Sequence, residues 1–225
     1  MEFRVEKAVL DAGVKIVFAV IRGLDNTTAN EEWLMRREVW LEELLERYKG
    51  IDVHQDAILE GFNILHEHTG VKRRKNIPAS ENLVKLLLKH GSLAYINKVV
   101  DIYNIISLDS KQALGAHNID YVSGNVTLRF SNGTERFVPL GQTEPIPISP
   151  HEYSYIDDSN EVLCRLEIRQ VQKTLVDETA RNVFYIVQGY EATSAELLLQ
   201  TAQQIIDLTT RYSGGKGKII IPKII

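Results

Sequence analysis

Residues 162–169 concentrate side chains that can bind a polar ligand. The alternation of a β-strand places Arg165, Glu167 and Arg169 on one face, and Gln170 follows directly. Guanidinium and amide donors at this density suit a carboxylate, a phosphate or a ribose. The same alternation also fits the solvated face of an edge strand. The sequence alone leaves a binding site and a solvated face both open.

A second polar group follows in residues 114–120, which we expect to form a turn. His117 has the chemistry of an acid, a base or a ribose contact, and it equally fits a structural role. Asn118 adds an amide beside it. Gly115 permits close approach of a ligand or of another backbone segment. This turn is a candidate wall of a pocket.

A third group lies on the helix predicted over residues 93–108. Most of its side chains are apolar, but Asn97, Asp101 and Asn104 fall in one narrow stripe. Buried polar groups cost roughly 1–3 kcal/mol each when they have no partner. The stripe therefore either braces the adjoining turn or contacts a ligand directly.

Composition limits the classes of partner. The chain has 225 residues and a net charge of −4, so contact with nucleic acid must depend on a local basic patch. The best candidate is the run Lys72, Arg73, Arg74 and Lys75 in a loop. His66 and His68 point in opposite directions on a helix, which argues against a metal site. We predict no metal and no cofactor.

The lone Cys164 and the absence of a signal-peptide pattern predict a cytoplasmic protein without a membrane segment. Helical periodicity and capping residues predict helices at about 29–48, 56–68, 80–90 with Ser80 as its cap, 93–108 and 195–212. Strands are expected at 3–10, 14–21, 162–169, 182–188 and 218–225, with a hairpin of 126–130 and 134–138 around Asn132-Gly133. Together they predict one α+β domain over residues 1–225, with a mixed or antiparallel sheet packed against helices.

Several stretches resemble the aminoacyl-tRNA editing module of the phenylalanyl-tRNA synthetase beta subunit, most strongly over about residues 61–190. They are Pro78-Ala-Ser-Glu-Asn-Leu, Val100-Asp-Ile-Tyr-Asn-Ile, Gly115-Ala-His-Asn-Ile-Asp, Gly124-Asn-Val-Thr-Leu-Arg-Phe and Asp177-Glu-Thr-Ala-Arg-Asn-Val. The resemblance implies a freestanding protein that hydrolyses the ester of a mischarged tRNA. It implies catalytic roles for Arg165, Arg169 and His117. It implies substrate contacts by Asn104, Gly115, Asn118, Glu167, Gln170 and Thr174, and tRNA phosphate contacts by Lys72, Arg73, Arg74 and Lys75.

The chain departs from the synthetase pattern at two positions. Gly115 stands where the synthetases typically carry a histidine, and Ile186 stands where they carry a glutamate. Tyrosine specificity is therefore not carried over. Two other interpretations remain open, a non-catalytic tRNA- or RNA-binding module and a pocket for a free amino acid. The resemblance implies tRNA as partner, with neither DNA nor membrane, and the sequence fixes neither the amino acid nor the oligomeric state.

Overall fold

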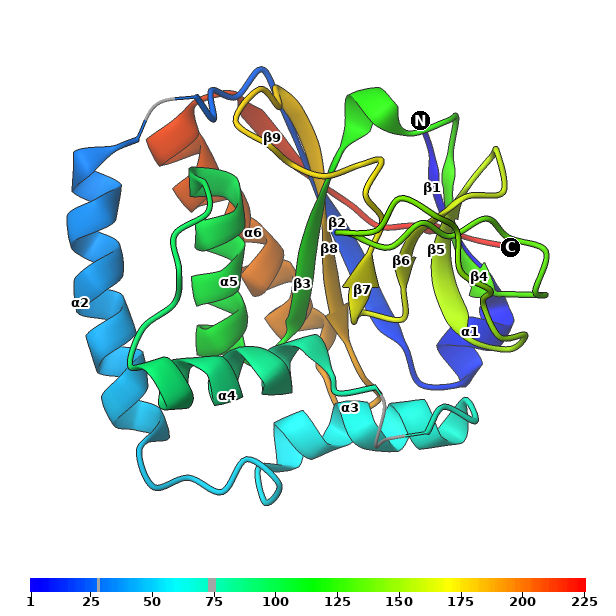
Figure 1. Cartoon of the computed structure of the whole chain (residues 1–225), viewed down its shortest axis with the longest axis horizontal. Coiled ribbons are helices and arrows are strands. Elements are labelled where there is room, and N and C mark those ends of the chain that lie inside the picture. The colour runs from blue at the N-terminus through cyan, green and yellow to red at the C-terminus, as the bar shows by residue number, and fades with distance from the viewer. Residues whose placement is uncertain (28, 73–75) are drawn as a thin grey trace.

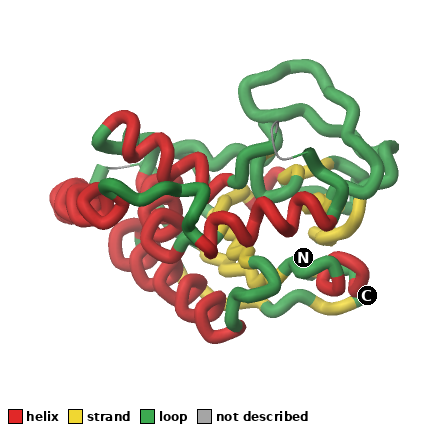
Figure 2. The backbone as a smooth tube through the Cα atoms, turned by 90° about the horizontal axis from the view of Figure 1, so that it is seen from below, coloured by secondary structure: helices red, strands yellow, loops and turns green. Residues whose placement is uncertain are grey.

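The protein folds as two β-sheets packed against each other, with helices on the outer side of one sheet (Figure 1). The structure is a computed structural model that describes residues 1–27, 29–72 and 76–225. Most helices lie on one side of the strands, as the view from below also shows (Figure 2). The expected α+β class is confirmed, with two sheets in place of one.

The smaller sheet is antiparallel throughout, in the order β3-β8-β2-β9. Its strands are β2 (Lys15–Arg22), β3 (Ala113–Asn118), β8 (Asn182–Gly189) and β9 (Lys216–Ile220). The larger sheet is mixed, in the order β10-β1-β4-β5-β6-β7. Its strands are β1 (Phe3–Val5), β4 (Val126–Phe130), β5 (Tyr153–Asp157), β6 (Val162–Arg165), β7 (Arg169–Gln170) and β10 (Lys223–Ile224).

The helices begin and end where local chemistry satisfies their free backbone groups. They are α1 (Lys7–Asp11), α2 (Glu31–Tyr48), α3 (Ala57–His68), α4 (Ala79–His90), α5 (Lys98–Ser110) and α6 (Ala195–Ser213), with a short 3-10 helix η2 (Ile119–Tyr121). Asn30, Asp56, Asn97 and Ser194 cap α2, α3, α5 and α6 through their side chains. Gly91 ends α4 in the left-handed conformation, φ 72°.

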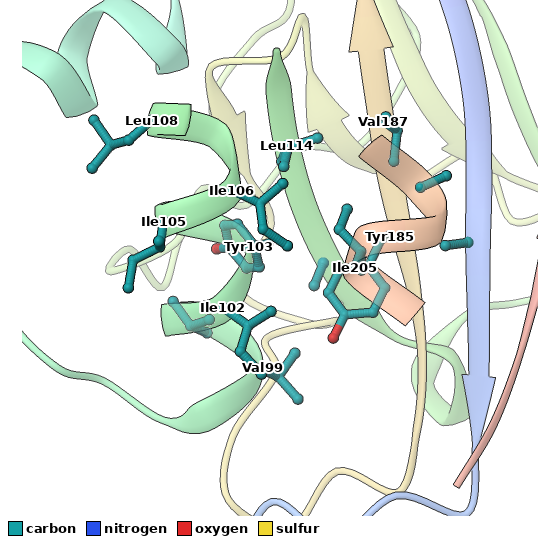
Figure 3. Close-up of a cluster of buried hydrophobic side chains, with 14 of the residues drawn as sticks. Val99, Ile102, Tyr103, Ile105, Ile106, Leu108, Leu114, Tyr185, Val187 and Ile205 are labelled. Atoms are coloured by element: carbon teal, nitrogen blue, oxygen red, sulfur yellow. The ribbon is translucent and has the colours of Figure 1, made fainter. Parts of the chain in front are cut away.

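Alternating residues of the smaller sheet build two cores. Tyr185 and its neighbours on one face pack against α5 and α6 (Figure 3). Residues of the other face, Phe18 among them, pack against the larger sheet, where the ring centroids of Phe3 and Phe18 lie 4.4 Å apart. Because both faces are buried, the central strands are continuously apolar, which made residues 14–21 predictable as a strand.

Several element boundaries differ from the sequence prediction. Residues 7–11 form α1, so the first strand ends at Val5. The helix expected from residue 93 begins at Lys98, because Asn97 caps it by accepting a hydrogen bond from the Val100 N–H at 3.1 Å. Ser80 lies inside α4 and is not its cap, since the helix begins at Ala79.

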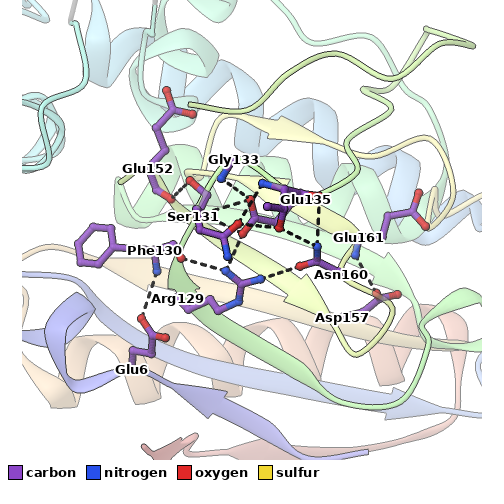
Figure 4. A network of polar contacts seen from close by, with 12 residues as sticks. Glu6, Arg129, Phe130, Ser131, Gly133, Glu135, Glu152, Asp157, Asn160 and Glu161 are labelled. Carbon is purple, nitrogen blue, oxygen red and sulfur yellow. Dashed lines mark hydrogen bonds and ion pairs between the residues drawn. The ribbon is translucent and has the colours of Figure 1, made fainter. Parts of the chain in front are cut away.

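The hairpin predicted around Asn132-Gly133 is wrong. β4 pairs with β1 and β5, and residues 134–138 contribute only an isolated bridge between Arg136 and Glu161. The Glu135 carboxylate accepts hydrogen bonds from the N–H groups of Asn132 and Gly133, and Arg129 donates to it at 2.6 Å (Figure 4). This buried carboxylate organises the segment as a loop, so the turn residues do not join two paired strands.

The predicted strand 162–169 is also interrupted. β6 ends at Arg165, Leu166 takes a left-handed conformation with φ 53°, and β7 returns antiparallel to β6. Arg165, Glu167 and Arg169 therefore do not share one strand face. The predicted edge strand 218–225 is likewise divided, because β9 borders the smaller sheet and β10 borders the larger one.

Candidate functional site

A cleft of about 380 Å³ opens where the terminal strands of the two sheets, β3 and β7, approach each other beside α4 and α5. Its walls are Ile77, Ala79, Asn82, Leu83, Tyr103, Asn104, Leu114, Leu140, Glu167, Ile168, Arg169 and Gln170. The volume lies within the range of small-ligand pockets. Asn104, Glu167, Arg169 and Gln170 were all predicted as site residues, and the fold brings them to this one cleft.

The tight β6–β7 turn carries three consecutive residues into the cleft. Left-handed Leu166 reverses the chain, and its N–H donates to the Tyr153 carbonyl at 3.0 Å. The Ile168 N–H donates to the Arg165 carbonyl at 3.2 Å and closes the turn. Ile168, Arg169 and Gln170 are then partly exposed at the cleft wall. The turn is thus the element that presents the polar groups.

Glu167 points inward from the same turn and anchors it. Its carboxylate forms an ion pair with His66 of α3, Nε2 to Oε1 at 2.7 Å, and accepts a hydrogen bond from the Tyr153 hydroxyl. Gln188 of β8 donates to the Tyr153 hydroxyl at 3.2 Å and accepts from Tyr155 at 2.5 Å. All five side chains are buried. The Glu167 carboxylate is committed to this network, so it is unavailable to a ligand in the cleft.

The charges of His66 and Glu167 stabilise each other in the interior. Burial is the largest single effect and opposes ionisation of both, but the charge and hydrogen bond of the partner, together with further hydrogen bonds, outweigh it. The Glu167 carboxylate raises the pKa of His66, and the His66 imidazolium lowers the pKa of Glu167. The pair therefore holds the turn as an ion pair.

Arg169 and Asn104 are the polar groups that remain available. Among the described residues, the Arg169 guanidinium has no carboxylate within ion-pair distance, and neither side chain has a hydrogen-bond partner. Both line the cleft and are partly exposed. A guanidinium in this position can bind a phosphate, a ribose oxygen or an ester carbonyl oxygen. Asn97 and Asp101 of the same predicted stripe serve structure, as helix cap and as ion-pair partner of Arg37.

His117, Asn118 and Thr174 form a separate group outside the cleft. His117 is fully buried between the sheets, where its Nδ1 lies 2.7 Å from the Thr174 hydroxyl and its ring stacks on Phe184. Burial lowers the pKa of His117 to about 3. The Asn118 N–H donates to the Thr174 carbonyl at 2.9 Å, and its side chain caps η2. The segment 113–118 is strand β3, where a turn was expected.

Arg165 also lies apart from the cleft walls. Its guanidinium donates to both oxygens of Glu152, at 2.5 and 2.6 Å, and to Asn76 at 3.0 Å. It fastens the β6–β7 turn to two loops. The structure therefore does not bring Arg165, Arg169 and His117 together on one surface. Of the basic run, Lys72 is exposed, and Arg73, Arg74 and Lys75 lie outside the described residues.

Gly115 lies behind the cleft, beneath the Gln170 side chain. A Cβ built on Gly115 would come within 2.8 Å of Gln170 Nε2. The Gln170 side chain also lies close to the Tyr103 hydroxyl of α5. Sequence reasoning missed Tyr103, because an aromatic residue on an apolar helix face has the pattern of a core residue. It also missed Leu140, which directly follows the isolated bridge residue Pro139.

Within the described residues, no three His, Cys, Asp or Glu side chains are grouped as metal ligands, and no helix meets the length and hydropathy needed to cross a bilayer. A solved structure, the N-terminal fragment of the phenylalanyl-tRNA synthetase beta subunit from Pyrococcus horikoshii, superposes with a TM-score of 0.51. The match covers 100% of this chain and 51% of that one, at 16% identity. It establishes likeness of fold.

Sequence comparison identifies relatives of a similar kind. The phenylalanine–tRNA ligase beta subunit of Mycoplasma pneumoniae is 28% identical over 129 residues, which are 57% of this chain and 15% of that protein. Its counterpart in Mycoplasma genitalium is 26% identical over 134 residues, 60% of this chain and 16% of that protein. The B3/4 domain family matches residues 68–212. Since this match spans more than half of the chain, the protein belongs to the B3/4 domain family.

Proposed function

We propose that this protein is a trans-acting aminoacyl-tRNA editing protein, which hydrolyses the ester of a mischarged tRNA. Its B3/4 family membership and its similarity to phenylalanine–tRNA ligase beta subunits support a tRNA-related role. The observation that carries the proposal is the cleft at the sheet edges, where the Arg169 guanidinium, unpaired among the described residues, lies beside the amides of Asn104 and Gln170.

The reaction requires water to add to the ester carbonyl carbon, after which the bond to the ribose oxygen breaks. The ribose oxygen leaves with a proton, and free amino acid and tRNA are released. Arg169 would stabilise negative charge on the carbonyl oxygen or hold the terminal adenosine. Asn104 would orient the ester. In such a site, the rate enhancement comes from hydrogen-bond donors held in fixed positions and from the closeness of the attacking water to the bound ester.

Two residues with predicted catalytic roles receive supporting roles in this proposal. His117 is a residue of β3 that does not line the cleft, and it is buried and neutral at physiological pH because its pKa is lowered to about 3. Arg165 is bound by Glu152 and Asn76. We assign both to holding the cleft walls, with direct substrate contact left to Arg169, Asn104 and Gln170.

A non-catalytic tRNA-binding module is the second candidate. One observation favours it. Among the described residues of the cleft wall, the single carboxylate is Glu167, and its oxygens are engaged by His66 and Tyr153. No free general base therefore lines the described wall, and hydrolysis must rely on positioned donors and water.

The test is a deacylation assay on a panel of tRNAs, each esterified with a cognate or a noncognate amino acid. We expect first-order release of amino acid from at least one mischarged tRNA. Arg169→Ala should reduce the rate roughly 100-fold, the scale of losing one charge-stabilising donor. Arg36→Ala, an exposed arginine on α2, is the matched control and should leave the rate unchanged. Intact esters across the panel, together with tRNA binding, would establish the binding module instead.

A further inference from the structure

Gln170 occupies the closed side of the cleft. Its backbone is held on two sides, by pairing with Cys164 of β6 and by accepting a hydrogen bond from the Leu140 N–H at 2.9 Å. With the backbone fixed, the position of the carboxamide depends on the side-chain torsions alone. The Gln170 amide therefore forms part of the cleft wall, and the residues that contact it determine its position.

Gly115 provides the space for that amide. It lies on β3, opposite Ile186 of β8, on the side of the sheet that faces β7. An added Cβ would sit 2.8 Å from Gln170 Nε2, closer than real Cβ contacts allow, and at an ordinary contact distance of 3.9 Å from Cδ. The atom in the way is the far end of a flexible side chain. A substituent at position 115 would therefore displace the amide and leave the strand in place.

Tyr103 holds the amide from the other direction. It is buried on α5 and lines the same cleft, with its hydroxyl close to the Gln170 amide. Burial raises the pKa of Tyr103 to about 12, so the hydroxyl stays neutral at physiological pH. Three segments distant in sequence thus fix one carboxamide. Leu114 and Leu140 flank it on the cleft wall, and Arg169 is the neighbouring charge.

We infer that Gln170 is a specificity-determining residue, which sets how large a neutral acyl side chain the cleft accepts. This inference rests on the proposed ester hydrolysis. The walls around Gln170 are uncharged apart from Arg169, and the Glu167 carboxylate is turned away. A cationic side chain would find no accessible counter-charge on the described walls. Because the proposed function assigns Arg169 to the ester carbonyl oxygen or the terminal adenosine, it is not left to pair with an anionic side chain. The substrate class is therefore esters of amino acids with uncharged side chains, limited in size by the carboxamide.

The geometry predicts opposite effects for two substitutions. Gln170→Ala removes the wall and enlarges the cleft. Gly115→Ala displaces the Gln170 amide from its present position. Because β3 and Tyr103 block movement in two directions, the amide moves into the cleft and narrows it. In the double variant no amide remains to be displaced. It should therefore behave like Gln170→Ala alone, a non-additive result that signals direct contact.

The measurement is kcat/KM for two esters on one tRNA, phenylalanyl as the bulky neutral group and alanyl as the small one. We expect Gln170→Ala to raise the ratio of kcat/KM for the phenylalanyl ester to kcat/KM for the alanyl ester by about tenfold. A change of that size is typical when a pocket gains the volume of a few methylene groups. Gly115→Ala should lower the ratio. The control is Gln172→Ala, because Gln172 accepts a hydrogen bond from the Gly141 N–H and does not line the cleft.

The outcomes separate this inference from the proposed function. Hydrolysis by the wild-type protein with a ratio that stays within about twofold in Gln170→Ala overturns the specificity role alone. No hydrolysis of any ester by the wild-type protein overturns the proposed function and this inference with it. Thermal unfolding of each variant identifies a folding defect. A ratio compares two esters on the same folded protein, so a partly unfolded sample lowers both rates and leaves the ratio unchanged.

Discussion

Glu167 keeps its charge in the interior because neighbouring side chains compensate it. His66 supplies the opposite charge and Tyr153 a hydrogen bond. Breaking one partner of such a buried pair typically costs about 3–5 kcal/mol, since the other charge remains without compensation. The pair joins α3 to the β6–β7 turn, two elements about 100 residues apart in sequence. Its contribution to the cleft is to fix the turn that presents Arg169 and Gln170.

The pair predicts a change in how stability depends on pH. The pKa of His66 is raised above its ordinary 6.5, so its contribution is complete below that pH and is lost as pH rises through the raised value. In Glu167→Gln, burial acts on His66 without the carboxylate, and the Arg165 charge acts in the same direction, so the pKa of His66 should fall. That variant should instead lose stability as pH drops below 6.5, by up to about 1.4 kcal/mol per pH unit for one proton.

Urea unfolding of both proteins between pH ~5 and ~9 measures the effect. His117 lowers the stability of both proteins at acidic pH. Its pKa is lowered to about 3 in the folded chain, so the unfolded chain binds a proton that the folded chain does not. The difference between the two proteins therefore isolates His66. Glu144→Gln, an exposed carboxylate, should reproduce the wild-type profile. Parallel profiles for the wild type and Glu167→Gln would contradict the assigned ion pair.

Residue types predicted much of the cleft, and contacts decided the rest. Arg169 and Gln170 were predicted from the density of hydrogen-bond donors at the end of the strand, and Asn104 from the polar stripe on an otherwise apolar helix. The residue type of His117 alone could not show that it lies outside the cleft. Only the fold shows that Thr174 and Phe184 bury it. Arg165 has the same chemistry as Arg169, and the difference between them is Glu152, a partner supplied by a loop that no local pattern places nearby.

The same division between local pattern and distant contact holds for whole elements. The central strands and the long helices follow from periodicity and caps, which are properties of short sequence windows. The failed hairpin had the right turn residues, but the Glu135 carboxylate bound the backbone of Asn132 and Gly133, and β1 took the edge of β4 that a partner strand would need. Leu166 ended a strand that alternation alone would have continued.

Asn97 provides a prediction for the helix that forms one cleft wall. Its side chain caps α5 by accepting from the Val100 N–H, and it donates to the Val176 carbonyl at 3.0 Å. Asn97→Ala should therefore lower the free energy of unfolding by about 2 kcal/mol, one cap plus one buried hydrogen bond. Ser194→Ala on α6 removes a cap without a second contact and should cost about 1 kcal/mol. Equal losses in chemical denaturation would show that the Val176 contact contributes nothing.

Across the whole molecule, the cleft lies where three layers end together. Leu114 and Ala116 of β3 belong to the core between the helices and the smaller sheet, and His117 of β3 stacks on Phe184 of the core between the two sheets. β7 is the last strand of the other sheet. A ligand at this junction contacts both sheets and the helical layer, so shifts in their packing change the cleft. Topology of this kind depends on long-range pairing, which sequence windows do not contain.

Because the chain has a net charge of −4, tRNA binding must depend on local basic residues, so the dependence of tRNA affinity on salt concentration tests the tRNA proposal. If Lys72, Arg73, Arg74 and Lys75 contact phosphates, tRNA affinity should fall as salt rises, with a logarithmic slope of about −0.7 to −0.9 for each contact. Replacing all four by Gln should weaken binding and flatten that slope. The matched control replaces Lys7, Lys49, Lys216 and Lys223 by Gln, four exposed lysines elsewhere, and changes net charge by the same amount. Fluorescence anisotropy with labelled tRNA over a salt series measures the affinity and the slope for each variant. Equal weakening of tRNA binding in the two fourfold variants would indicate attraction by overall charge. Binding that does not depend on salt would favour a pocket that recognises a free amino acid without the tRNA backbone.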